Sequence, residues 1–565
     1  MARILITSAL PYINGVKHLG NLVGSLLTAD VHARFCRQIG DDVLFISGTD
    51  EHGTAVELAA AEAGLDVRDY CDRQYAVHAD IYRRFGFSFD HFGRSSSPEN
   101  HTLTQHFYRR LDAAGLIEER TTRQIWSPVD QRFLPDRYVL GTCPSCGFDQ
   151  ARGDQCDGCG QLLDPIDLIA PRSALSGDIA LAWRESRHLF LRQSLLVDQL
   201  NEWIDSRSGW PAFVRSWSKS WLTSDLRDRC ITRDLAWGVP VPRPGFEEKV
   251  FYVWFDAPIA YIAATQEWAN LDPSRRDWRS WWFGARDVRY IQFLGKDNVP
   301  FHTLSFPATL IGSGEAWKTV DVIKGFHWLT FGRAKFSTRS RRGVFADAAL
   351  EEYPADIWRW WLIANAPESS DSEFTVRRFA TDINTDLADV FGNFVNRIIR
   401  FTHQAFDGRI PSGGAPIDRE LALAANIDRS VARLRNYHQC LQFRRAAAET
   451  RAIWATANAY LQEAAPWALL KTSPEQAAIV TRTALKLCAL SATLAWSIVP
   501  ALAEHVLSAF GGQAPIPAWP ENIEQTLFDG RGVGGPVEWL APIVTKISDS
   551  DVARLEARFG GPVPA

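Results

Sequence analysis

The stretch ILITSALPYINGVKHLGNLVGSLL, residues 4–27, decides the fold. Residues 3–8 form an apolar run typical of a buried strand, and residues 22–38 carry apolar side chains at helical spacing. A second apolar run, DDVLFISGTDEHG at 41–53, ends in a polar cluster. Strand, helix and strand with short connections predict a parallel α/β sheet, with functional residues at the C-terminal ends of the strands.

Length and composition limit the class of protein. A chain of 565 residues that is 46% hydrophobic is too long for one ordinary domain, so we expect three or four. The net charge of −5 argues against a generally basic coat that binds nucleic acid, but a local basic face fits it. The apolar N-terminal run is too short for a signal peptide, and no run of about 20 apolar residues predicts a membrane span. We therefore expect a cytoplasmic protein without membrane contact.

Four of the nine cysteines cluster in CPSCGFDQARGDQCDGCG, residues 143–160. Cys143 and Cys146 form one CxxC pair, and Cys156 and Cys159 form another. Two such turns can present four thiolates to one zinc ion, and a closed four-cysteine site is structural because no position is left for water. The alternative is a chance grouping of cysteines. The other five cysteines are scattered, which favours buried free thiols over a disulfide framework.

Two loops are candidates for a phosphate site. The first holds His18 and Gly20 after the first strand, where a helix N-terminus would favour negative charge. The second is AKFSTRSRRG at 334–343, whose cations and hydroxyls suit a polyphosphate leaving group. Taken singly, a histidine in such a loop is more often a turn or capping residue, and a basic loop of this kind is more often a solvated turn. Their pairing across one α/β domain strengthens both.

These loops resemble the signatures of class I aminoacyl-tRNA synthetases. HLGN at 18–21 is similar to the HIGH motif, and KFSTR at 335–339 to the KMSKS loop. The resemblance narrows to the methionyl-tRNA synthetase family through further blocks in the same order, which together span about residues 3–510. These blocks are TSALPYINGVKHLGNL (7–22), GTDEHGT (48–54), FLPDRYVLGTCPSCG (133–147), VWFDAPIAYI (253–262), FLGKDNVPFHT (293–303) and EAAPW (463–467).

The resemblance implies a Rossmann-like parallel-sheet catalytic domain with a zinc-knuckle insertion, followed by an all-α anticodon-binding domain. The implied boundaries are 1–115 for the first half of the catalytic domain, 116–240 for the connective insertion with the zinc knuckle, 241–325 for the second catalytic half, 326–378 for the KMSKS-type loop and stem-contact region, and 379–565 for the helical domain with its C-terminal extension. The short sequence after Leu540 leaves no room for an appended dimerisation domain, so we expect a monomer.

The implied activity is methionine activation with Mg–ATP, which gives methionyl-adenylate and pyrophosphate, followed by transfer to tRNA(Met) for initiation and elongation. The positions that match the methionine pocket are Ala9, Leu10, Tyr12, Asp50, Trp254, Ala257, Pro258, Tyr261 and His302. Those that match the catalytic and nucleotide-binding positions are His18, Asn21, Gly295, Asp297, Lys335, Ser337, Thr338 and Arg339, with His18, Asn21, Lys335 and Thr338 as the catalytic ones. Asp50 would hold the substrate ammonium, and aromatic walls suit a thioether.

In the helical domain, Asn393 and Arg397 lie at i and i+4 and therefore share one helix face. Together with Trp467, which follows a proline, they match the family's readers of the anticodon CAU, with Trp467 as a stacking platform for an unpaired base. Surface polar residues and a core tryptophan are the alternatives.

Two departures from the family pattern stand out. Asn21 replaces the second histidine of HIGH, and Thr338 and Arg339 stand where KMSKS has Lys and Ser. They support an alternative reading as a catalytically weakened paralogue that binds tRNA or senses methionine. Leucyl or cysteinyl synthetases are the other alternative. The short insertion disfavours the editing enzymes, and the closed four-cysteine knuckle disfavours the cysteinyl type.

Overall fold

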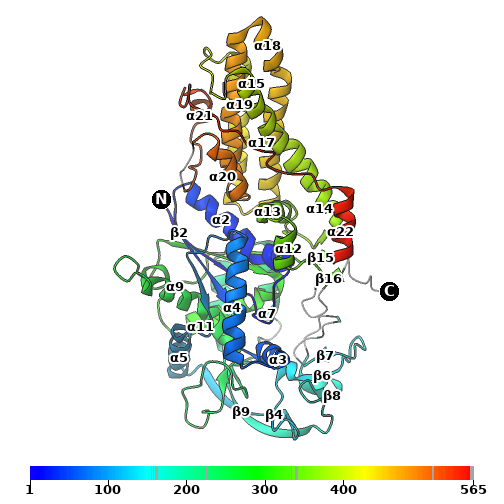
Figure 1. Cartoon of the computed structure of the whole chain (residues 1–565). Helices are drawn as coiled ribbons and strands as arrows, with labels where there is room; N and C mark the ends of the chain where they lie inside the picture. The colour runs from blue at the N-terminus through cyan, green and yellow to red at the C-terminus, as the bar shows by residue number, and fades with distance from the viewer. Residues whose placement is uncertain are drawn as a thin grey trace.

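The computed structural model describes residues 1–153, 156, 158–159, 163–223, 226–332, 334–336, 342–511 and 515–559. The molecule is elongated, with a twisted sheet near its middle (Figure 1). Long helices extend from one side of the sheet, and a long β-hairpin with several short strands lies on the opposite side.

The central sheet has five strands, and all of its pairings are parallel. Its order is β14 (Val322–Phe326), β13 (Val288–Gly295), β1 (Arg3–Ser8), β2 (Asp42–Thr49) and β3 (His91–Arg94). The strand order reverses at β1: β2 and β3 lie on one side of it, and β13 and β14 lie on the other. In parallel α/β sheets this reversal opens a crevice at the C-terminal strand ends, where ligands bind. The predicted parallel α/β class is confirmed.

Alternation along β1 explains why both faces of the sheet are covered. Ile4 and Ile6 belong to one buried cluster, together with side chains of α2 (Leu27–Gln38). Leu5 belongs to another buried cluster, which includes Ile262 and Ala263 of α9 (Ala260–Asn270). Because successive side chains of a strand point to opposite faces, one apolar strand supports two helical layers.

The helix expected over 22–38 is present, but it begins earlier and its start is irregular. A short α1 (Leu19–Asn21) leads into a π-helical segment, Leu22–Leu26, before α2 continues to Gln38. Such π-segments are often found at functional sites. This one directly follows the HLGN turn.

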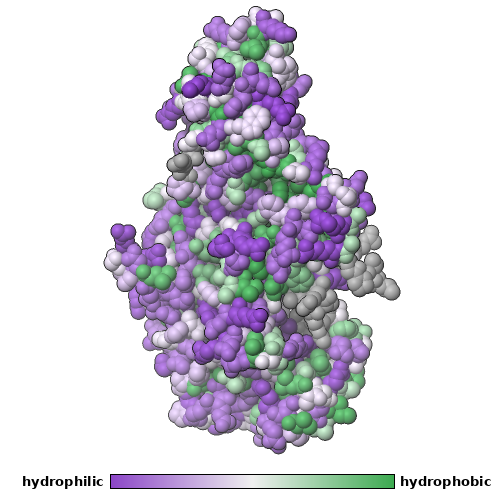
Figure 2. Space-filling view, in the orientation of Figure 1, coloured by the Kyte–Doolittle hydropathy of each residue, from purple (hydrophilic) through white to green (hydrophobic). Residues whose placement is uncertain are grey.

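The segment between the two halves of the sheet is built mainly from β-structure. A hairpin pairs β4 (Ile117–Ser127) with β9 (Ala182–Leu191). The small strands β6 (Val139–Thr142), β7 (Ala151–Arg152) and β8 (Ile169–Ser173) form a separate sheet beside the cysteine pairs. Figure 2 shows hydrophobic residues on the surface in this lower part of the molecule. The exposed hydrophobic side chains of the segment include Ile166 and Ile169.

The C-terminal part is helical, as expected. Its main helices are α15 (Asn393–Ala405), α16 (Asp418–Gln439), α17 (Phe443–Ala464), α18 (Pro466–Thr472), α19 (Pro474–Ala495) and α20 (Pro500–Ser508). By length and hydropathy α19 could cross a membrane, but 83% of its most apolar window is buried inside the protein. It packs against α17, α18 and α20, which marks it as the core helix of this bundle.

A buried ion pair connects the central sheet to the helical part. Asp30 of α2 accepts a hydrogen bond of 2.6 Å from Arg359 of α13 (Ala355–Ala364), and both side chains are fully buried. Arg359 also donates to the carbonyls of Phe85, Ser497 and Ile498. Arg34, Arg359 and hydrogen bonds from Ser88 outweigh the effect of burial, and the pKa of Asp30 falls to about 2. The pair is therefore charged and fully hydrogen-bonded at neutral pH.

The last helix returns towards the central sheet. Arg554 and Arg558 of α22 (Asp549–Phe559) form ion pairs with Glu352 of α12 (Ala346–Glu352), and Arg558 also pairs with Glu351. Helix α12 begins directly after the basic loop, and the Ala346 N–H donates to the Lys17 carbonyl at 2.9 Å. The helical part is thus attached at both of its ends.

We expect Asp30→Asn to lower the free energy of unfolding by about 3–5 kcal/mol, because the Arg359 charge stays buried without its counter-ion. Urea unfolding monitored by tryptophan fluorescence measures the change. The matched control is Asp80→Asn, which removes an exposed pair with Arg83 and should cost at most about 1 kcal/mol. Equal effects of the two substitutions would contradict the larger contribution to stability that we assign to the buried pair.

Candidate active site

The HLGN turn is fixed by a reciprocal cap. The Asn21 N–H donates to Nδ1 of His18, and the His18 N–H donates to Oδ1 of Asn21, both at 3.3 Å. The two residues therefore satisfy donors at the start of the helix, as in a capping box. A Cβ at position 20 would lie 3.1 Å from Nδ1 of His18, so the glycine leaves room for the imidazole ring.

Residues within and beside the basic loop pack against this turn. The ring of Phe336 stacks on His18 with 4.8 Å between ring centroids. The backbones of Phe345 and His18 pair as an isolated antiparallel β-bridge. The Leu19 N–H donates to the Val344 carbonyl at 3.0 Å. These contacts place parts of the two loops side by side, although the loops lie some 300 residues apart in sequence.

His18 is neutral at physiological pH. Burial, with a smaller contribution from the Lys17 charge, lowers the pKa of His18 to about 3. Because Nδ1 accepts the Asn21 N–H, the single ring proton of the neutral form resides on Nε2. His18 is thus a hydrogen-bond donor without positive charge.

The structure describes only part of the basic loop. The backbone of Lys335 lies in β16 (Ala334–Lys335), which pairs with β15 (Leu329–Phe331). The Lys335 side chain lies outside the described part, as do residues Ser337, Thr338 and Arg339. The roles expected for these four side chains stay predictions.

Asp50 follows β2 directly and faces the loop after β1. Tyr12 pairs with Asp50 as a parallel bridge, and the Ile13 N–H donates to the Asp50 carbonyl at 3.1 Å. Asp50 is 5% exposed, and its Oδ1 has no hydrogen-bond partner among the described residues. Burial, with the nearby Asp256 and Glu51, raises the pKa of Asp50 well above its usual value. A cationic group placed here would relieve the cost of this buried carboxylate.

The expected aromatic residues form one connected wall beside Asp50. The Trp254 indole donates to the Tyr12 hydroxyl at 2.5 Å, and the Trp254 ring packs on Phe301 with 3.9 Å between centroids. Deeper in the core, the Tyr261 hydroxyl donates to Nε2 of His302 at 3.1 Å. Nδ1 of His302 donates to the Asn298 carbonyl at 3.0 Å. Burial lowers the pKa of His302 to about 4, which keeps this ring neutral.

The remaining expected positions lie at the strand ends or in the helix that follows. The Ala9 N–H donates to the Phe293 carbonyl at 2.9 Å, which joins the ends of β1 and β13, and the Leu10 backbone faces the Tyr261 hydroxyl. Ala257 and Pro258 are buried directly after Trp254 and its short helix. Gly295 ends β13, and a Cβ there would lie 2.6 Å from Oδ1 of Asp297, so glycine lets this carboxylate fold back.

Several titratable residues of the site were missed by sequence reasoning. Lys17 is 6% exposed and donates to Oδ1 of Asn14 at 2.8 Å, and burial lowers its pKa to about 7 against the opposing effect of Asp50. Behind Asp50, the buried His52 and Asp256 are in contact, with 2.8 Å between Nδ1 and Oδ2. All three lie within the blocks quoted above, but only their proximity in space shows that these titratable groups are neighbours.

In the helical part the structure brings two of the expected anticodon readers together. The Arg397 guanidinium lies over the Trp467 ring at 5.1 Å, and its Nη2 donates to Gln462 at 2.8 Å. Trp467 is 38% exposed at the start of α18, and Asn393 is exposed one turn before Arg397 on α15. The arrangement is a solvent-accessible aromatic face flanked by a cation and an amide.

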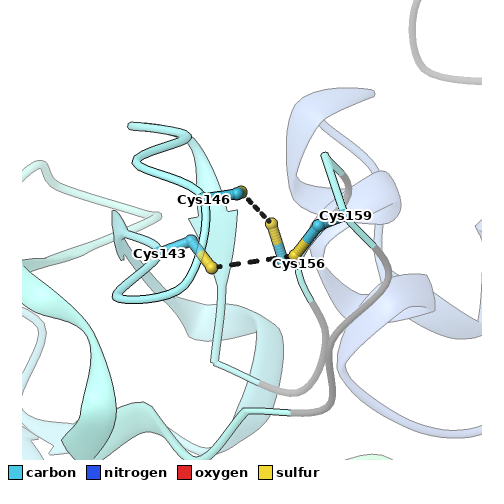
Figure 3. A group of neighbouring side chains, drawn as sticks. All are labelled: Cys143, Cys146, Cys156 and Cys159. Atoms are coloured by element: carbon cyan, nitrogen blue, oxygen red, sulfur yellow. Dashed lines mark hydrogen bonds between the residues drawn. The ribbon is translucent and has the colours of Figure 1, made fainter.

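The four clustered cysteines converge on one point (Figure 3). Their sulfur atoms all lie within 4.8 Å of one another, with 3.9 Å between Cys143 and Cys159 and 3.6 Å between Cys146 and Cys156. Tetrahedral Zn–S bonds of about 2.3 Å place sulfur atoms about 3.8 Å apart. The donor set and spacing therefore fit a zinc ion.

Comparison with known proteins agrees with this geometry. A family model described as tRNA synthetases class I (M) matches residues 4–399, and one described as the anticodon binding domain of methionyl tRNA ligase matches residues 410–563. A methionine–tRNA ligase of Caulobacter vibrioides is 54% identical over 569 residues, covering 99% of this chain and all of the relative. One from Streptomyces avermitilis is 51% identical with the same coverage.

A solved structure of methionyl-tRNA synthetase from Mycobacterium tuberculosis, in complex with methionyl-adenylate, is similar to this chain with a TM-score of 0.75 and 25% identity. The alignment covers 96% of this chain and 99% of the other. Together with the parallel sheet, the paired loops and the helical C-terminal part, these matches show that the chain belongs to the methionyl-tRNA synthetase family of class I aminoacyl-tRNA synthetases.

Proposed function

We propose that this chain is a methionine–tRNA ligase that activates L-methionine with Mg–ATP and transfers it to the 3′ end of tRNA(Met), for both initiation and elongation. The observation that carries the proposal is the contact between the His18 turn and the flanks of the basic loop, beside the buried Asp50. Family membership and full-length similarity to methionine–tRNA ligases support it.

In the first step the methionine carboxylate attacks the α-phosphate of ATP, and pyrophosphate leaves. Asp50 would bind the methionine ammonium, and the wall of Tyr12, Trp254 and Tyr261, with His302 behind, would hold the thioether through sulfur–ring contacts. The other pocket positions, Ala9, Leu10, Ala257 and Pro258, would shape the apolar floor. A carboxylate that lacks a partner until substrate arrives suits selection of an α-amino group.

Phosphate binding would use donors from both loops. The Nε2–H of neutral His18 would donate to a phosphate oxygen, and the amide nitrogen of Asn21 remains available because its Oδ1 is used in the cap. Lys335, Ser337, Thr338 and Arg339 would stabilise charge that develops on the leaving pyrophosphate. Gly295 and Asp297 would lie beside the nucleotide, and Mg²⁺ would accompany ATP.

In the second step a terminal ribose hydroxyl of the tRNA attacks the methionyl carbonyl, and AMP leaves. Asn393, Arg397 and Trp467 would read the anticodon, with the exposed indole as a stacking surface. We propose the domain division 1–115, 116–240, 241–325, 326–378 and 379–565, a structural zinc ion on the four cysteines, a monomeric state and a cytoplasmic location.

Methionine-dependent exchange of pyrophosphate into ATP tests the first step. Purified protein should support exchange with methionine and not with leucine or cysteine. We expect Asp50→Asn to raise the KM for methionine by about 30-fold or more, because a charged hydrogen bond in a buried site is worth about 2 kcal/mol or more. The KM for ATP and the unfolding midpoint should change little. An unchanged KM for methionine would refute the role of Asp50, and absence of exchange with every amino acid would refute the function.

Trp467→Ala should reduce charging of both initiator and elongator tRNA(Met) by about 10- to 100-fold, because stacking of one base is worth about 1–3 kcal/mol. Pyrophosphate exchange should stay at the wild-type rate, since the substitution lies in the helical part. Trp539→Ala is the matched control: it removes an indole that is 55% exposed elsewhere in the C-terminal part and should leave charging unchanged. Loss of exchange with Trp467→Ala would show a structural rather than a recognition role.

Metal analysis tests the cysteine cluster. Wild-type protein and Cys440→Ser should each carry one zinc ion per chain, whereas Cys143→Ser should lose it, because three thiolates bind zinc more weakly than four. Retention of zinc in Cys143→Ser would place the ion elsewhere.

A further inference from the structure

Three buried carboxylates lie together where β2 ends, and they differ in their partners. Glu51 is fully buried and accepts hydrogen bonds from Nε of Arg94 at 2.9 and 3.1 Å. Asp256 contacts His52, with 2.8 Å between Oδ2 and Nδ1. Oδ1 of Asp50 has no hydrogen-bond partner among the described residues. Glu51 and Asp256 thus each contact a basic side chain, whereas Asp50 has no such contact at salt-bridge distance in the described part of the chain.

The contact between His52 and Asp256 is enclosed by the protein. Their side chains are 1% and 0% exposed, and Asp256 ends the short helix α8 (Val253–Asp256). The rings of His101 and Trp237 lie 5.5 and 5.6 Å from the His52 ring, between centroids. Nε2 of His52 has no hydrogen-bond partner among the described residues. The contact with Asp256 is therefore the polar interaction that orients this ring.

The pair closes a ring of contacts around the proposed methionine pocket. Helix α8 carries Trp254 as well as Asp256. The Trp254 indole donates to the Tyr12 hydroxyl at 2.5 Å, and Tyr12 pairs with Asp50 as a β-bridge. His52 follows Asp50 by two residues, and its ring returns to Asp256. The proposed ammonium site and the aromatic wall are therefore joined at two places, and the buried pair is one of them.

A polar pair at this place has a cost that an apolar contact would not have. Burial raises the pKa of Asp256, against the opposing effects of His52 and of Asn100, whose Nδ2 donates to Oδ2 at 3.3 Å. After burial, the Asp256 charge contributes most to the raised pKa of Asp50. Apolar side chains of similar shape would pack here without these costs. What the polar pair adds is direction, because a hydrogen bond holds two side chains at a defined distance and angle.

We propose that His52 is a positioning residue for methionine recognition: by pairing with Asp256 it holds Asp50 and the aromatic wall around Trp254 at the separation that suits one methionine molecule. The ammonium then reaches Asp50 while the thioether of the same molecule reaches the wall. Small displacements of groups that orient a substrate have large effects on its binding and reaction. This role rests on the proposed function, because it belongs to the same site.

Two substitutions of Asp256 separate the hydrogen bond from the charge. Asp256→Asn and Asp256→Leu both remove the negative charge beside Asp50, but only asparagine retains an oxygen that can accept from Nδ1 of His52. In pyrophosphate exchange, we expect the KM for methionine to stay within about twofold of wild type in Asp256→Asn and to rise about tenfold in Asp256→Leu. The kcat and the KM for ATP should change little in both. Equal KM values for methionine in the two variants would overturn the proposal.

The double variant His52→Leu/Asp256→Leu separates positioning from stability. Both members of the pair become apolar, so the unfolding midpoint in urea should lie closer to that of the wild type than the midpoint of Asp256→Leu does. The KM for methionine should nevertheless stay raised by about tenfold, because no directional contact remains between the two segments. A wild-type KM for methionine in the double variant would show that the pair serves folding alone.

Norleucine, in which a methylene replaces the sulfur of methionine, tests the effect on the wall. In Asp256→Leu the preference for methionine over norleucine, measured as the ratio of kcat/KM values, should fall about threefold because sulfur–ring contacts weaken when the wall shifts. An unchanged preference would refute the effect on the wall.

His106→Leu is the matched control. It removes another histidine–carboxylate contact, between His106 and Glu315 at 2.7 Å, which lies outside the ring of contacts around the pocket. The KM for methionine should stay at the wild-type value, and an increase equal to that of Asp256→Leu would overturn the specific role of His52. Absence of exchange in wild-type protein would instead refute the proposed function, and calorimetric titration with methionine would still report on the pair.

Discussion

The hydrogen-bonded ion pair between Asp30 and Arg359 constrains the position of the helical part relative to the central sheet. Asp30 lies in the helix that continues from the HLGN turn, and Arg359 bonds to backbone carbonyls at the junction of α19 and α20. Such a pair is costly to bury and is stable only when every polar atom is satisfied. Its geometry therefore favours one position of the helical part relative to the HLGN turn.

Within the active site of the free protein, some buried polar groups lack an opposite charge or a hydrogen-bond partner. Asp50 is buried with an unpartnered oxygen, Lys17 is buried near it with a lowered pKa, and His18 and His302 are held neutral. Substrate groups would supply the missing partners: an ammonium for Asp50 and phosphate oxygens for the donors of the turn. Binding energy would then come from completing a preformed network rather than from building one.

The sequence was sufficient for the parallel sheet, the helical C-terminal part and the cysteine cluster, because each follows from local periodicity or spacing. It was not sufficient for the role of Asn21. Comparison with the HIGH motif suggests that Asn21 replaces a histidine that contacts phosphate. In the structure, Oδ1 of Asn21 instead accepts the His18 N–H and caps the start of the helix. Lys17 and the pair of His52 and Asp256 were also missed, because their significance depends on burial and on neighbours distant in sequence. The spacing of apolar residues likewise does not predict the π-helical segment at the start of the first long helix.

The C-terminal helix has a consequence for the distance between the proposed anticodon contact at Trp467 and the HLGN turn. Because α22 is held to α12 by ion pairs, the helical bundle is attached to the catalytic part at its entry and again at its exit. An attachment at two separated points restricts rotation of the bundle more than an attachment at one point does. If Trp467 contacts the anticodon as proposed, the tRNA must span a distance to the HLGN turn that these attachments restrict.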